Sequence, residues 1–168
     1  MACGGDVLGS WTIEGVCFSE PPEFGISIDG CEASTQVMSY EASGTLDFSA
    51  SSLVTIAEDS EAVYSATFPS ACLGSISCAS LAMVLTYDSS SGTAMSMSSA
   101  VCAQVASGCL CDITDAYIAT ATGTWAASGS TITITFTFEG SSSTADYCVQ
   151  GTTLHLGFEG IAYVANRG

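Results

Sequence analysis

The chain has 168 residues, of which 48% are hydrophobic and 11% are charged, so it is long enough for one domain and too apolar for a disordered polymer. Seventeen acidic residues stand against one basic residue, Arg167, and the net charge is −16. Nucleic acids and anionic membrane surfaces are therefore disfavoured as partners, because binding them takes several lysines or arginines.

The chain begins with Met1-Ala2-Cys3-Gly4-Gly5. This start is typical of a bacterial lipoprotein that has been cut back to its lipobox cysteine and given an initiator methionine. In that interpretation residues 1–5 are a tail, Cys3 is the site of lipidation, and residues 6–168 form a single domain. The alternative is an incidental cysteine. No apolar stretch reaches the ~18 residues of a membrane-spanning helix, so we expect no membrane span.

Apolar and polar residues alternate along most of the chain, which predicts an all-β fold. Residues 19–30 and 88–92 are expected to be loops, and the strand pattern of 34–48 is interrupted near Ser43-Gly44. The predicted strands are residues 6–18, 34–48 (one strand or two), 53–57, 62–68, 95–106, 109–114, 118–127, 131–138, 144–149, 152–156 and 161–164.

The segment 58–61 carries three acidic residues and is predicted to be the turn of a hairpin between 53–57 and 62–68. Such a turn is either a calcium site or a solvated loop. It lacks the alternating aspartates and the glycine of an EF-hand loop, which favours the solvated loop.

Residues 77–87 are predicted to be a short helix. Leu81, Val84 and Leu85 recur at helical spacing, and Ser77 stands where an N-cap is expected. We expect this helix to lie against the sheet or across one end of a barrel.

The segment from Gly123 to Leu156 is predicted to be a three-turn meander with turns at 128–129, 140–143 and 150–151. These turns place one set of side chains on a single apolar face. That face is either a filled core or the wall of a cavity for one small apolar ligand. The predicted ligand-binding residues are Trp125, Ile132, Ile134, Phe136, Phe138, Tyr147, Leu154 and Leu156.

The same registers place Asp146 directly opposite His155, the only histidine. Such a pair is the basis of a general-base dyad or of a nucleophilic triad. Because the two residues belong to the threonine-lined side, a cross-strand ion pair near solvent is the favoured interpretation. These two are the only catalytic candidates, and both are weak.

Nine cysteines without a C-x-x-C motif, and with one histidine, predict disulfides rather than a metal site. Cys109 and Cys111 point the same way on a strand, so they need different partners. Cys102 is expected to take one and Cys148 the other, and Cys17–Cys31 and Cys72–Cys78 are the other two predicted pairs. The predicted disulfide cysteines are Cys17, Cys31, Cys72, Cys78, Cys102, Cys109, Cys111 and Cys148.

Several short motifs resemble those of secreted bacterial lipoproteins described as lipocalin-like. They are Cys3-Gly-Gly5, Leu8-Gly-Ser-Trp11 with the Gly-x-Trp start of lipocalin-like barrels, Ser70-Ala-Cys-Leu73, Gly108-Cys-x-Cys111 and Tyr147-Cys-Val-x-Gly-x-Thr-Leu154. The resemblance implies an antiparallel up-and-down lipocalin-like β-barrel of 8–10 strands with a short helical insertion. It also implies a secreted or lipid-anchored location in the outer cell envelope, and it supplies no catalytic residues.

Three functions remain open. The first is binding of a neutral or cationic apolar small molecule in the barrel interior, and the second is a structural or interaction protein of the cell envelope with a packed core. The third is a barrel enzyme of the isomerase or cyclase type, which requires an inward-facing acid or base. A non-enzymatic role is favoured, and no cofactor is expected.

Overall fold

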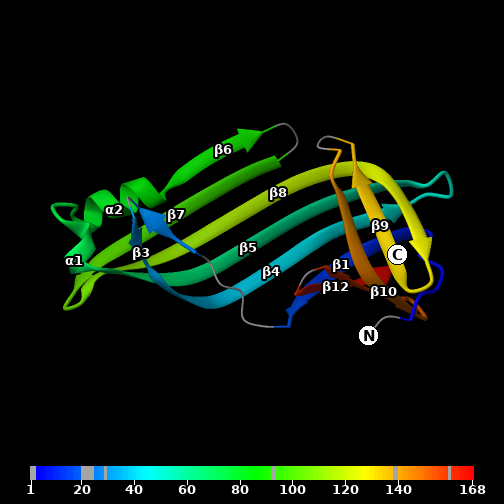
Figure 1. The fold of residues 1–168 in the computed structure, drawn as a ribbon, viewed down its shortest axis with the longest axis horizontal. Coiled ribbons are helices and arrows are strands. Elements are labelled where there is room, and N and C mark those ends of the chain that lie inside the picture. Colours follow the sequence, from blue (N-terminus) through cyan, green and yellow to red (C-terminus); the bar gives the residue numbers. More distant parts are fainter. Residues whose placement is uncertain (1–2, 20–24, 29, 92–93, 138–139, 159) are drawn as a thin grey trace. The chain divides into compact units, whose positions relative to one another are not determined.

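The computed structural model describes residues 3–19, 25–28, 30–91, 94–137, 140–158 and 160–168. Most of the described chain is β-strand, with two short helices (Figure 1). The strands are β1 (Gly9–Phe18), β2 (Ser27–Ile28), β3 (Cys31–Glu32), β4 (Ser34–Phe48), β5 (Leu53–Pro69), β6 (Tyr87–Ser91), β7 (Ala94–Val105), β8 (Gly108–Ser128), β9 (Thr131–Phe136), β10 (Ser142–Gln150), β11 (Thr153–Phe158) and β12 (Ile161–Arg167). The helices are α1 (Ser70–Leu73) and α2 (Cys78–Leu85).

Ten of these strands form one antiparallel sheet in the order β5-β4-β1-β12-β11-β10-β9-β8-β7-β6. β5 also pairs with β8, which closes the strands from β5 round to β8 into a ring. The β1–β12 pairing joins the first strand to the last, and the other ring strands neighbour each other in chain order. The prediction of an antiparallel up-and-down barrel with a short helical insertion is confirmed.

The chain forms two compact units. Unit 1 contains residues 1–20, 41–59 and 118–168, and unit 2 contains residues 21–40 and 60–117. β4, β5 and β8 each contribute part of their length to both units. The sequence predicts one domain over residues 6–168, and the structure divides this stretch within β4, β5 and β8, which continue across the division without a loop.

Residues 3–5 are bound to β10 in unit 1 and are not a free tail. The amides of Cys3 and Gly4 donate hydrogen bonds to the carbonyl oxygen of Tyr147 at 3.1 and 3.0 Å, and the amide of Val149 donates to the carbonyl oxygen of Gly4 at 2.9 Å. A disulfide joins Cys3 to Cys148. One sulfur cannot hold both a disulfide and a lipid, so the lipidation predicted for Cys3 does not fit this structure.

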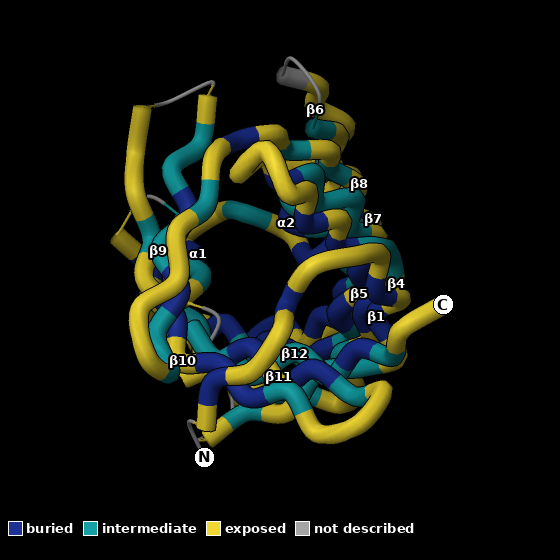
Figure 2. The backbone as a smooth tube through the Cα atoms, turned by 90° about the vertical axis from the view of Figure 1, so that its right-hand side faces the viewer, coloured by how far each residue is buried: buried dark blue, intermediate teal, exposed yellow. Residues whose placement is uncertain are grey.

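Unit 1 encloses a continuous apolar core. Along β9 and β11 buried residues alternate with less buried ones, as expected for strands with one face inward (Figure 2). The Trp11 indole nitrogen donates a hydrogen bond to the carbonyl oxygen of Val7 at 2.8 Å, and the Arg167 guanidinium lies 4.5 Å from the Trp11 ring centroid. The buried core residues are Val7, Trp11, Ile13, Leu46, Phe48, Val54, Ile132, Ile134, Ala145, Tyr147, Leu154, Leu156 and Ala165.

The β8–β9 turn lies one residue later than predicted. Its two loop residues are 129 and 130, so Trp125 lies opposite Ile134 instead of Ile132. The β10–β11 turn is displaced in the same way, to residues 151 and 152. Each displacement changes the register by two residues.

The β9–β10 register differs more. Ala145 lies opposite Ile132 instead of Phe138, which is a change of six residues. All three changes are even, and side chains alternate between faces with a period of two. The predicted apolar face is therefore preserved although every predicted pairing along it is displaced.

The predicted hairpin across residues 58–61 is wrong, because β5 runs through them without a turn. Alternation continues there, with Ser60 buried and Asp59 and Glu61 exposed. Glu58 is half-buried and accepts a hydrogen bond from the Tyr163 hydroxyl, at 3.4 Å to Oε2. The acidic residues sit on an extended strand, so the segment forms neither the solvated turn nor a calcium loop.

Three other predicted interruptions are also strand. Residues 34–48 form β4 without a break, and residues 108–128 form β8 instead of two strands. Of the loop predicted over 88–92, residues 88–91 belong to β6, and residue 92 lies outside the described residues. Gly108 begins β8 with φ of 145°, and a Cβ there would lie 2.0 Å from the carbonyl oxygen of Phe68. Only glycine allows the two backbones to approach so closely.

In unit 2 the helix α2 packs against β7. Ser77 is its N-cap, as predicted, because the Ser77 side chain accepts a hydrogen bond from the Ser80 amide at 3.1 Å. Leu81 is fully buried, whereas Met83 and Val84 are exposed. The helix predicted over 77–87 is thus confirmed for Cys78–Leu85.

The disulfides of unit 2 confirm one part of the predicted pairing. Cys102 bonds Cys111, and Cys78 bonds Cys109, so the two cysteines of the Cys-x-Cys motif have separate partners as expected. The predicted Cys72–Cys78 pair is wrong, because α2 directs Cys78 to β8. The Cys72 side chain lies outside the described part of the structure.

The remaining cysteines differ from the prediction. Cys17 is an exposed free thiol, so the predicted Cys17–Cys31 bridge is wrong, while Cys31 is disulfide-bonded. The pairing of β1 with β12 shifts between Ile13 and Gly15. This irregularity interrupts the alternation, so Cys17 does not share the buried face of Ile13. Cys148 bonds Cys3 instead of the Cys-x-Cys motif.

Candidate functional site

The residues predicted to line a barrel interior meet in the core of unit 1. Phe138 lies outside the described residues, and the others are Trp125, Ile132, Ile134, Phe136, Tyr147, Leu154 and Leu156. They pack against further side chains, as in the edge-to-face contact of Trp125 with Phe48 at 5.6 Å between ring centroids. The predicted apolar face is present, and these contacts describe a packed core.

The predicted pair of Asp146 and His155 does not form. His155 lies opposite Cys148, and Asp146 lies opposite Gly157. The two-residue register change at the β10–β11 turn separates them, and both side chains are exposed. This geometry supports neither the general-base dyad nor the cross-strand ion pair.

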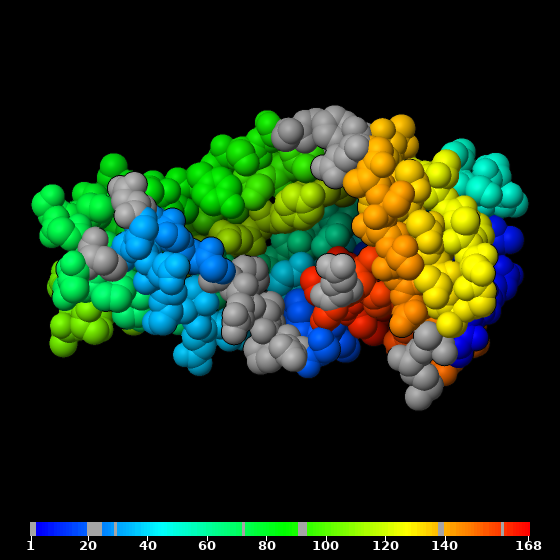
Figure 3. Space-filling model, in the orientation of Figure 1, coloured from blue at the N-terminus to red at the C-terminus, as the bar shows by residue number. Residues whose placement is uncertain are grey.

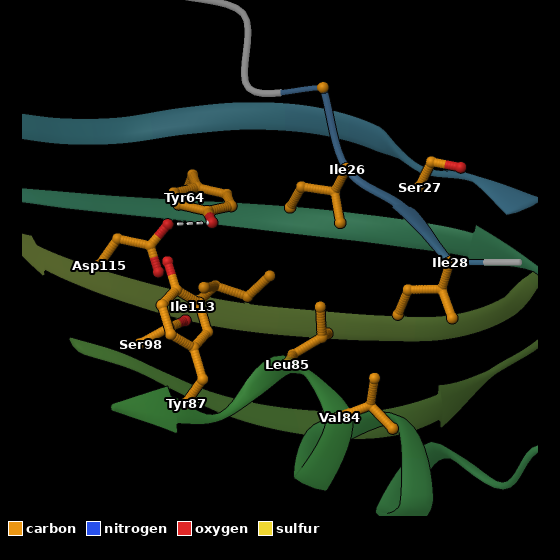
Figure 4. Close-up of a pocket in the computed structure, with 11 residues that line it drawn as sticks. Ile26, Ser27, Ile28, Tyr64, Val84, Leu85, Tyr87, Ser98, Ile113 and Asp115 are labelled. Carbon is orange, nitrogen blue, oxygen red and sulfur yellow. Dashed lines mark hydrogen bonds between the residues drawn. The ribbon is translucent and has the colours of Figure 1, made fainter. Parts of the chain in front are cut away.

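A pocket of about 550 Å³ opens in unit 2, a volume within the range of small-molecule sites. The segment leading into β2 forms one side, and the end of α2 with the start of β6 forms the other (Figure 4). In the space-filling view the β2–β3 segment, in blue, lies beside the green atoms of the α2–β7 segment (Figure 3). The apolar lining is Ile26, Ile28, Val84, Leu85 and Ile113.

Polar groups gather at one end of this pocket. Tyr64 of β5, Ser98 of β7 and Asp115 of β8 project from the sheet that forms the floor, and Tyr87 of β6 stands beside them (Figure 4). Tyr64 and Ser98 are buried, with 4% and 6% of their surface exposed. The Tyr64 hydroxyl donates a hydrogen bond to Oδ2 of Asp115 at 2.5 Å. The other carboxylate oxygen, Oδ1, is buried and has no hydrogen-bond partner among the described residues.

The environment at this end of the pocket keeps the Tyr64 hydroxyl protonated, so that it acts as a hydrogen-bond donor. Burial raises the pKa of Tyr64 above its ordinary value, and the hydrogen bond and negative charge of Asp115 raise this pKa further. Tyr64 is consequently protonated throughout the neutral and mildly alkaline range. Asp115 therefore has one oxygen that accepts the Tyr64 hydrogen bond and one buried oxygen with no donor among the described residues.

Disulfides hold the elements around the pocket. Cys78, the first residue of α2, is bonded to Cys109 of β8, and Cys102 of β7 is bonded to Cys111 of β8. Cys109, Cys111, Ile113 and Asp115 belong to the same side of β8, since residues two apart share a face. The covalent links thus fix α2 and β7 to the strand that carries Asp115.

Sequence reasoning missed this site because it placed a break between strands at residues 115–117. A signal was nevertheless present. Cys109, Cys111 and Ile113 alternate as inward residues, and Asp115 is next in that series. An acid in line with buried residues indicates a polar group inside the fold, and Tyr64 occupies the equivalent inward series on β5 with Ala62, Ala66 and Phe68.

Among the described residues, no group of three or more His, Cys, Asp or Glu side chains is arranged to hold a metal ion. No described helix has the length and apolar character needed to cross a membrane. Comparison with protein-family models, curated proteins and solved structures gave no match.

Proposed function

We propose that this protein binds a small, largely apolar molecule in the pocket of unit 2. The observation that carries this proposal is the pocket itself, about 550 Å³ with an apolar lining and one polar end. Such a combination is typical of small-molecule sites, in which a few polar groups orient an apolar ligand. Binding at this place differs from the barrel interior expected from the sequence.

The compartment follows from the cysteines. Disulfides in both units fit an oxidising, extracytoplasmic environment. We propose further that the protein is secreted or exposed at the outer cell envelope. Peptide mass spectrometry of unreduced protein from its natural source tests this, because it shows whether Cys3 carries a disulfide, a lipid or neither.

The binding experiment uses the neutral fluorescent dye N-phenyl-1-naphthylamine, whose emission rises in apolar surroundings. Val84→Trp is expected to abolish that rise by filling the pocket from the exposed end of α2. Val84 is 61% exposed and Met83 is 76% exposed, so both tolerate a large side chain and Met83→Trp is the matched control. Equal dye binding by the native protein and by Val84→Trp would overturn the proposal.

A second candidate is a structural or interaction protein of the envelope. The packed core of unit 1 favours it, since that core leaves the predicted ligand-lining residues in contact with one another. Absence of dye binding by the native protein, together with a cooperative and stable fold, would favour this second function.

A further inference from the structure

The unpartnered oxygen of Asp115 indicates which ligand the pocket takes. Oδ2 accepts the Tyr64 hydrogen bond, whereas Oδ1 is buried with no partner in the described structure. A buried carboxylate oxygen without a donor is costly. A ligand that donates a hydrogen bond at this point removes that cost.

The chain offers no positive charge for Asp115 within unit 2. Residues 21–40 and 60–117 contain no lysine, arginine or histidine. Arg167, the only Lys or Arg, belongs to unit 1, where its Nη2 donates to the carbonyl oxygens of Asp6 and Leu8 at 2.9 and 3.1 Å. A counter-charge for Asp115 must therefore come from outside unit 2.

A metal ion is a poor candidate for that counter-charge. Among the described residues, Asp115 is the only carboxylate that lines the pocket, and none of these residues form a cluster of metal-binding side chains. An organic cation needs only one carboxylate, and its apolar part fits the remaining wall. Two tyrosine rings, Tyr64 and Tyr87, also line the pocket, and aromatic rings favour cations nearby.

We infer that the pocket selects apolar amines, whose ammonium group donates a hydrogen bond to Oδ1 of Asp115 while the apolar part lies against Ile26, Ile28 and Leu85. This inference rests on the proposed function and specifies its ligand class. The raised pKa of Tyr64 supports it, because a protonated Tyr64 hydroxyl donates to Oδ2 and leaves Oδ1 as the acceptor for a ligand.

The test compares decylammonium, decyltrimethylammonium, decanol and decanoate by calorimetry at physiological salt. Charge-assisted hydrogen bonds are worth about 1.5–3 kcal/mol, so decylammonium should bind about 10- to 150-fold more tightly than decanol, and decanoate should bind weakest. Decyltrimethylammonium has the charge but no N–H, so its affinity should fall between those of decylammonium and decanol.

Asp115→Asn keeps the shape of the side chain and the acceptor for Tyr64 but removes the charge. It should therefore bring the affinity for decylammonium to within a few-fold of the affinity for decanol. Asp112→Asn is the matched control, because Asp112 is exposed on the other side of β8 and its loss changes the net charge equally. Asp112→Asn should keep the full preference, and circular dichroism checks that both variants fold.

Equal binding of decanol and decylammonium by the native protein would overturn the amine inference. So would an equal loss of preference in Asp112→Asn and Asp115→Asn, which would indicate attraction by the overall charge. In both cases the proposed function stands if the neutral dye binds and Val84→Trp blocks it. If the dye binds Val84→Trp normally, the pocket itself is the wrong site.

Discussion

Cys3 is bonded to Cys148 across a sequence separation of 145 residues. The bridge holds the start of the chain on β10, beside the backbone hydrogen bonds between Gly4 and residues 147 and 149. In the chain-entropy description, a bridge over so long a loop restricts the unfolded chain strongly.

Removing this bridge is therefore expected to destabilise the protein. The double substitution Cys3→Ser and Cys148→Ser should lower the free energy of unfolding by up to about 5 kcal/mol, the chain-entropy value for a loop of this length. Urea unfolding followed by tryptophan fluorescence measures the difference. An unchanged midpoint would show that Cys3 and Cys148 are not bonded in the folded protein.

Cys17 should be the reactive thiol. It is exposed and free, while Cys3, Cys31, Cys78 and Cys148 are all in disulfides. Iodoacetamide added without a reducing agent should modify Cys17, and peptide mass spectrometry locates the label. Cys17→Ser should abolish the labelling. Labelling of Cys31 without labelling of Cys17 would show that the amino-terminal half has a different disulfide pattern.

Tyr64 should ionise at a higher pH than ordinary tyrosines. Burial and Asp115 raise its pKa, so the absorbance of the folded protein at 295 nm should show no Tyr64 ionisation near pH 10. Tyr64→Phe should leave that native titration unchanged but reduce the titration in guanidinium by one of the six tyrosines. Equal reductions in both conditions would mean that Tyr64 is solvated.

The same pKa difference makes stability depend on alkaline pH. The unfolded chain loses the Tyr64 proton near pH 10, whereas the folded chain retains it to higher pH. The stability from this group is complete below pH 10 and falls above it, by at most about 1.4 kcal/mol per pH unit. Urea unfolding at several pH values should show a shallower alkaline loss in Tyr64→Phe than in the native protein.

Gly108 should be intolerant of a side chain. Its φ of 145° is unfavourable for other residues, and a Cβ would lie 2.0 Å from the Phe68 carbonyl oxygen. Gly108→Ala should cost at least about 1–3 kcal/mol from backbone strain, with the steric clash added. Gly15→Ala, on β1, is the control because no atom lies within 4 Å of its Cβ position. Equal stability of the two variants in urea unfolding would contradict this account of Gly108.

The chain's own pattern was sufficient for the fold class and for the apolar side of the carboxyl-terminal meander. Ile132 and Ile134 were placed inward correctly because inward and outward positions alternate by two, and even register errors do not change them. The helix N-cap at Ser77 was equally predictable, since a cap depends on residues three positions apart.

Exact pairings were not predictable by the same means. The turn between β10 and β11 accepts either of two adjacent positions by composition, and a displacement of one residue separates Asp146 from His155. Acidic residues at 58–61 and at 115 were taken as breaks between strands. The sequence alone does not show that the Tyr163 hydroxyl donates a hydrogen bond to Glu58, or that the Tyr64 hydroxyl donates one to Asp115.

Alternation, cap and cysteine content thus determined an all-β, disulfide-bonded chain with the short helix α2, because these features depend on neighbours within a few residues. Tertiary structure alone decided which cysteines meet, where β5 and β8 run on without a break, and that Tyr64 meets Asp115 in a pocket. Apart from the Cys102–Cys111 bridge, which joins residues nine positions apart, those outcomes depend on residues that are tens of positions apart, and only the closed register of the strands brings them into contact.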